Sequence, residues 1–74
     1  MESRIDTLLQ RHGYDPVRTS LAPALERAAV AEFVRRARHE ASRNHWAGAA
    51  YWATAAGAVL READGAVDQW GLTA

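Results

Sequence analysis

The pattern of apolar and polar residues predicts helices along the chain and no strand. The first apolar stripe recurs at helical spacing and consists of Ile5, Leu8, Leu9 and His12. The hydroxyl of Ser3 can cap this helix, because Asp6 follows three residues later in an arrangement similar to a capping box. Gly13 is a suitable left-handed stop. We therefore expect a first helix over residues 4–12.

The second apolar stripe is longer and follows a turn. The turn is expected around Pro16, because proline fixes its own φ and disfavours helical geometry in the residue before it. Asp15 is placed to cap a single short turn over residues 16–19. We expect a long helix over residues 21–42, with Pro23 in its first turn, where a missing N–H does no harm. Its apolar stripe consists of Leu25, Ala29, Val30, Phe33, Val34, Ala37 and Ala41.

The third predicted helix is unusual because residues 46–60 contain no charged side chain and are rich in alanine. We expect it over residues 45–64, with Asn44 as its N-cap and a short extension over residues 66–70 if the helix breaks near Gly65. Steps of three and four residues define a seam typical of helix–helix packing. The seam consists of Trp46, Ala49, Ala53, Ala56, Leu60, Ala63, Val67 and Trp70. Small residues at its centre permit close approach of a partner helix.

Together these elements predict an all-α fold, a single domain of three helices over residues 1–74. The second and third helices form a long antiparallel hairpin, and the short first helix packs across it. Each long helix spans about 30 Å at a rise of about 1.5 Å per residue, so the two apolar stripes can match along most of their length. The expected core consists of Ile5, Leu8, Leu9, Leu25, Phe33, Val34, Trp46, Ala53, Leu60 and Val67.

The size of the chain makes an additional interface plausible. A chain of 74 residues buries only about 60% of its unfolded surface, and the third helix has apolar residues on every side. We therefore expect this helix to bind a second copy of the chain or a larger protein. The predicted interface consists of Trp46, Ala49, Tyr51, Trp52, Ala53, Ala56, Leu60 and Trp70.

Candidate chemistry is sparse, which favours a non-enzymatic interaction module, such as an adaptor, an accessory subunit or a regulator. No nucleophile motif or glycine-rich phosphate loop is present, so we predict no catalytic residue and no cofactor. The chain has no cysteine, which excludes disulfides and thiolate metal ligands. The three histidines lack i,i+3 or i,i+4 spacing, so we predict no metal site; they are His12, His39 and His45.

The apolar stretch is shorter than the roughly 20 residues that a bilayer requires, so no membrane span is expected. The first residues carry charges and no long apolar run, which favours a cytoplasmic location over a secreted one.

A nucleic-acid-binding regulator is the main alternative, because the second helix carries a cluster of arginines that could contact phosphates. The cluster consists of Arg35, Arg36, Arg38 and Arg43. Three glutamates interleave with the basic residues of this region, and the net charge of the chain is zero. Nucleic-acid-binding proteins are usually basic, so we do not expect nucleic acid to be the partner.

A second alternative comes from the tripeptide Trp46-Ala47-Gly48, which lies between two predicted helices. It resembles the W-x-G turn of the small secreted WXG-type helical hairpins. The resemblance implies a dimer that is exported through a dedicated secretion apparatus. It covers three residues, and no tyrosine near the C-terminus is followed by an acid four residues later.

Overall fold

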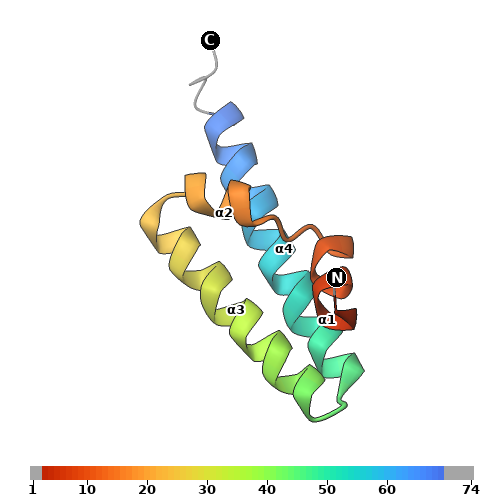
Figure 1. Cartoon of the computed structure of the whole chain (residues 1–74). Helices are drawn as coiled ribbons and strands as arrows, with labels where there is room; N and C mark the ends of the chain where they lie inside the picture. Colours follow the sequence, from red (N-terminus) through yellow and green to blue (C-terminus); the bar gives the residue numbers. More distant parts are fainter. Residues whose placement is uncertain (1–2, 70–74) are drawn as a thin grey trace.

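The computed structural model describes residues 3–69 of the chain, with side chains described over residues 3–63. The described residues form four helices and no strand: α1 (Arg4–Arg11), α2 (Pro16–Leu21), α3 (Ala24–Ser42) and α4 (Trp46–Gln69). α3 and α4 form an antiparallel hairpin, α1 packs against both of them, and α2 packs against α3 (Figure 1). The predicted all-α hairpin with a short first helix across it is confirmed.

α1 begins and ends as its sequence predicts. The Ser3 hydroxyl accepts a hydrogen bond from the backbone N–H of Asp6 at 3.3 Å and donates to the Asp6 carboxylate at 3.0 Å. At the other end Gly13 has a φ of 100°. The backbone N–H groups of Gly13 and Tyr14 donate to carbonyls of the last turn, each at 3.0 Å. This pair of bonds is a Schellman motif, which turns the chain away from the helix.

The region after α1 differs from its prediction. Residues 16–21 form a separate helix, α2, instead of a single turn, so residues 3–69 contain four helices where three were predicted. Asp15 caps α2 as expected, accepting a hydrogen bond from the N–H of Val17 at 2.9 Å. The predicted helix start at residue 21 is wrong, because Pro23 forces Ala22 into extended geometry, with a ψ of 156°. α3 therefore begins only after the proline.

Asn44 ends α3 instead of capping α4, which corrects its predicted role. Its φ of 63° lies in the left-handed region, where asparagine is tolerated better than most residues. Its N–H donates to the carbonyl of Ala41 at 2.9 Å, and the N–H of His45 donates to that of Glu40 at 2.8 Å. These bonds form a second Schellman motif. The Asn44 side chain also accepts a hydrogen bond from the indole N–H of Trp46 at 2.8 Å.

α4 continues to Gln69 without a break at Gly65, so the expected extension is part of the same helix. It runs past the first residue of α3 at the far end of the hairpin (Figure 1). Gly57, near its middle, permits a close approach of α1. A Cβ at this position would overlap the carbonyl oxygen of His12, the residue that ends α1. The end of α1 therefore rests directly on the backbone of α4.

The core lies between α1, α3 and α4, and four of the ten residues predicted for it are buried there: Leu9, Val34, Ala53 and Leu60. Its buried residues are Leu9, Val30, Val34, Ala37, Ala53, Ala56 and Leu60. Four predicted core residues pack at its margin or are half-buried: Ile5, Leu8, Phe33 and Trp46.

One predicted core residue is wrong, and three residues of the buried cluster were missed: Val30, Ala37 and Ala56. Leu25 is 79% exposed, because it lies on a side of α3 that no described element covers. Val30 and Ala37, which belong to the apolar stripe of this helix but not to the predicted core, have no exposed surface. The side chain of Val67 lies outside the described residues.

Candidate interaction face

Four residues of the predicted interface lie inside the monomer, which corrects that prediction. Ala49, Ala53 and Ala56 have no exposed surface, and Leu60 is 2% exposed. Three of the four share a buried cluster with residues of α3. The helical seam predicted for α4 therefore exists, but α3 of the same chain fills it. These four residues are not accessible to a partner in this fold.

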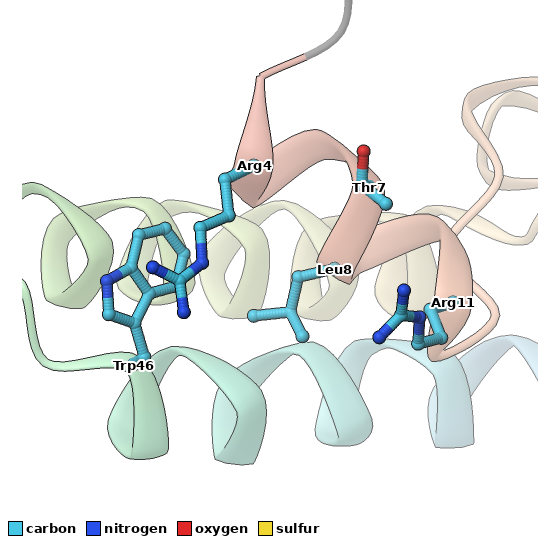
Figure 2. A pocket seen from close by; sticks show the side chains of 5 residues that line it. All are labelled: Arg4, Thr7, Leu8, Arg11 and Trp46. Carbon is cyan, nitrogen blue, oxygen red and sulfur yellow. The ribbon is translucent and has the colours of Figure 1, made fainter.

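Trp46 also serves the monomer, because it connects α1 to α4. The guanidinium of Arg4 lies over the indole, with 3.8 Å from Cζ to the ring centroid (Figure 2). The indole N–H of Trp46 also donates its hydrogen bond to the Asn44 side chain. The two side chains belong to a hollow of about 360 Å³ whose wall is completed by Thr7, Leu8 and Arg11. One face and the N–H of Trp46 are thus engaged by the chain itself.

Tyr51 and Trp52 remain accessible and meet an aromatic residue of α3. The rings of Phe33 and Trp52 stack with centroids 5.6 Å apart, and Tyr51 contacts Trp52 edge-on with centroids 5.0 Å apart. The guanidinium of Arg36 lies 5.0 Å from the centroid of the Trp52 ring. Tyr51 is 67% exposed, and Trp52 and Phe33 are half-buried. An accessible aromatic cluster therefore bridges the two long helices.

This cluster belongs to a longer surface, which we call the outer face. It consists of one stripe from each long helix: Leu25, Glu26, Ala29, Phe33 and Arg36 of α3, and Trp52, Ala55 and Val59 of α4. Leu25 and Glu26 precede Ala29 by four and three residues, and the other members of each stripe follow one another at steps of three or four, so each stripe lies on one side of its helix. Apart from Glu26 and Arg36, every member is apolar.

The contacts of α1 lie on the opposite side of the hairpin. Arg38 of α3 forms an ion pair with Asp6 at 2.9 Å, and Thr54 of α4 lies 3.2 Å from a ring nitrogen of His12. Successive residues of a helix are rotated by about 100° around its axis. Arg38 therefore points about 140° away from Phe33 on α3, and Thr54 points about 160° away from Trp52 on α4. Figure 1 shows α1 and α2 together in front of the hairpin. No element of residues 3–69 packs on the outer face.

The apolar residues of α3 already indicated a second face, although the predicted core did not take them into account. The apolar stripe of α3 contains two sets of residues, and α4 covers only one of them. Val30, Val34 and Ala37 are buried against α4, whereas Leu25, Ala29 and Phe33 lie along the outer face. A stripe wider than one neighbouring helix can cover indicates a second packing surface.

The arginines proposed for nucleic-acid contact are largely engaged by carboxylates. Glu32 accepts hydrogen bonds from Arg35 at 2.6 Å and from Arg36 at 2.7 Å. The hydrogen bonds from Arg35 and then Arg36 hold the pKa of Glu32 below its ordinary value. The same carboxylate raises the pKa of Arg35. Much of the positive charge in this part of α3 is therefore balanced locally.

A third arginine of the cluster connects α3 to α1. Arg38 pairs with Asp6, whose pKa is lowered by the hydrogen bond from the Ser3 hydroxyl and then by the one from Arg38. Arg43 lies at the C-cap of α3, where a cation favours the helix dipole. Since three of the four arginines pair with carboxylates of the same chain, little unpaired positive charge is left in this cluster to contact a phosphate backbone.

The histidines lie apart from one another. His45 pairs with Glu40 at 3.1 Å, and His12 contacts Thr54. Among the described residues, no group of three or more histidine and acidic side chains could hold a metal ion. Nor is any helix in this part of the chain long and apolar enough to cross a membrane. Trp70, the last residue of the predicted interface, lies outside the described residues.

No family model, curated protein or solved structure matches this chain. The Trp46-Ala47-Gly48 tripeptide behind the WXG resemblance forms the first turn of α4, just after the connection of the hairpin. Within the described part of the predicted α4 interface, the accessible residues that bridge the two long helices are Tyr51 and Trp52. The surface around them continues into the outer face.

Proposed function

We propose that this protein is a small non-enzymatic interaction module that binds another polypeptide through the outer face. The main support for the proposal is that the two faces of the hairpin are covered to different extents by the other helices of the chain. α1 and α2 cover one of them, whereas the outer face is mostly apolar and no described element packs on it. Exposed apolar surface that is continuous over two helices commonly marks a protein-binding site in a small protein.

The composition of the outer face supports binding by close helix packing. Trp52 and Phe33 form a large stacked group at one end, with Tyr51 at its edge. Interface binding energy concentrates in such aromatic residues. Ala29 and Ala55 have small side chains between the larger ones, so the backbone of a partner helix can approach closely at these positions. This mixture of large and small side chains is suited to a helical partner.

The proposal is tested by site-specific crosslinking on the two sides of the hairpin. A photoreactive benzoylphenylalanine replaces Tyr51, which is 67% exposed beside the outer face. A matched chain carries the same group at Thr7, which is exposed on α1 at the opposite side. In the cells that make the protein, position 51 should give a discrete crosslinked product and position 7 should not. Equal yields at both positions, or none at position 51, would contradict the proposal.

A substitution then links the product to the outer face itself. Ala29→Arg places a charge in the middle of this face, whereas Ala28→Arg places the same group on an exposed neighbouring position. We expect Ala29→Arg to abolish the crosslink at position 51 and Ala28→Arg to retain it. Circular dichroism checks that both variants remain helical.

A further inference from the structure

We infer that the polypeptide covering the outer face is a second copy of this chain, turned so that the two α3 helices run antiparallel. The inference rests on the proposed function and names its partner. A two-fold interface requires a surface that is complementary to itself. If one residue of the first copy contacts a second residue of the other copy, the same contact occurs again with the copies exchanged. The outer face meets this requirement in charge and in shape.

The charges of the outer face are self-complementary in one register. Its α3 stripe carries one acid, Glu26, and one base, Arg36, on either side of Ala29 and Phe33. A two-fold axis that passes midway between Ala29 and Phe33 lies equally far from Glu26 and Arg36 along the helix. Antiparallel pairing then places Glu26 of each copy opposite Arg36 of the other, which forms two equivalent ion pairs.

Arg36 is already held on this side of the hairpin, since its guanidinium lies over Trp52. It keeps about half of its side chain exposed (49%) while it bonds to Glu32. A guanidinium has five N–H donors, so the bond to Glu32 leaves donors for a second carboxylate. The ion pair across the interface therefore requires no internal contact to break.

The shapes match in the same register. The axis that pairs Glu26 with Arg36 also places Phe33 of each copy opposite Ala29 of the other. A large side chain then meets a small one at two symmetric points, which is the arrangement that lets facing helices interdigitate. The net charge of the chain is zero, so two copies approach without overall repulsion.

The area of the outer face is sufficient for a reversible dimer. The 19 residues of α3 span about 28 Å, and two helices side by side are about 20 Å wide. Each copy therefore offers about 560 Å², or about 1,100 Å² for the pair, just above the roughly 1,000 Å² that a specific interface needs. We expect a dimer that dissociates on dilution rather than a permanent one.

Charge exchange tests both the dimer and its register. The mass of the full chain is measured by light scattering and sedimentation over a range of concentrations. The unaltered chain should change from monomer to dimer as its concentration rises. Glu26→Arg and Arg36→Glu should each weaken the dimer by about tenfold or more, because each places like charges opposite one another at two points. An equimolar mixture of the two variants should dimerise again, because every pair across the interface is then of opposite charge.

Arg35→Glu is the matched control. Arg35 shares Glu32 with Arg36 and is its neighbour in sequence, but it lies away from the outer face. We expect this variant to lose its own ion pair with Glu32, as Arg36→Glu does, and yet to dimerise like the unaltered chain. If it weakens the dimer equally, or if the mixed variants stay monomeric, the antiparallel register is overturned.

The outcome for the unaltered chain separates this inference from the proposed function. A monomer at every concentration, with a position-51 crosslink to a different polypeptide, overturns the inference and keeps the proposed function. A monomer without a face-specific crosslink overturns both. A dimer whose position-51 crosslink joins two copies of the chain supports both.

Discussion

The two faces of the α3–α4 hairpin have different neighbours: α1 packs on one of them, which we call the covered face and which includes Arg38, Thr54 and Gly57, whereas no described element packs on the outer face. On the covered face, α1 inserts Leu9 into the core and rests on the backbone of α4 at Gly57. On the outer face, Phe33 and Trp52 contact each other across the two helices and remain half-buried. The comparison shows that an apolar stripe alone does not decide burial. The chain has to supply a further element, and α1, with eight residues, spans only about 12 Å.

The two faces also differ in how their charges are paired. The covered face has an ion pair between elements, Asp6 of α1 with Arg38 of α3. The described ion pairs near the outer face are local to α3, where Glu32 bonds to Arg35 and Arg36. Pairs between elements fix the position of one helix on another, whereas local pairs mainly support the helix that contains them. The ion pair of Asp6 with Arg38 therefore helps to orient α1, whereas the described ion pairs near the outer face hold no further helix against it.

The largest difference between the faces should appear when a leucine is removed from each. Leu9→Ala should lower the free energy of unfolding by about 3 kcal/mol, because it leaves a cavity in the core. Leu25→Ala should change that of the monomer by less than about 0.5 kcal/mol, because Leu25 is exposed. Urea unfolding at low protein concentration measures both values. Similar losses for the two variants would show that Leu25 is buried in solution.

The next largest effect concerns the contact of α1 with α4. Gly57→Ala should lower the free energy of unfolding by about 2 kcal/mol, since the new methyl group meets the His12 carbonyl and overpacks the contact. Gly48→Ala is the control, because its Cβ would lie 3.0 Å from the end of the flexible Glu40 side chain. Urea unfolding should show the control to be near neutral. A neutral Gly57→Ala would mean that α1 does not rest on α4 as described.

A smaller effect is expected for the cation over Trp46. Arg4→Ala should lower the free energy of unfolding by about 0.5–1 kcal/mol, the usual range for a cation–π contact at an exposed site. The indole N–H resonance of Trp46 should shift, while that of Trp52 on the outer face should not. Nuclear magnetic resonance at low concentration measures both signals. A shift of both resonances would indicate that the two faces are coupled.

The smallest effect is a dependence on pH. Asp6 has a lowered pKa in the folded chain because it accepts hydrogen bonds from Ser3 and Arg38. A carboxyl group of this kind contributes its stabilisation above its unfolded pKa, about 3.9, and loses it as the pH falls through the lower folded value. Acid should therefore weaken the docking of α1 in the unaltered chain more steeply than in Asp6→Asn. The Trp46 resonance measures this docking during an acid titration.

Glu32 provides a matched control for Asp6. Glu32 also has a lowered pKa, but its partners Arg35 and Arg36 lie on the same helix. We expect Glu32→Gln to leave the acid response of the Trp46 resonance unchanged. An equal effect of the two substitutions would mean that the Asp6–Arg38 pair does not orient α1.

Local residues determined most of the helix boundaries, because caps and stops act within a few residues. Ser3 and Asp6 gave the start of α1, Gly13 gave its end, and Asp15 gave the cap of α2. The effect of Pro23 was misjudged even though it is local, since the residue before a proline is restricted as well as the proline itself. Asn44 was misassigned because asparagine suits both an N-cap and a left-handed C-terminal position.

The three- and four-residue spacing of Ala49, Ala53, Ala56 and Leu60 places them on one side of any helix, so the residues alone predict the seam of α4. The fold decided what this seam contacts, because the spacing is the same whether the partner is α3 or another molecule. It likewise decided that Leu25 and Phe33 lie on the outer face while Val30 and Val34 lie in the core. The physical reason is that periodicity fixes directions around one helix axis, whereas burial depends on which elements of the folded chain reach each direction.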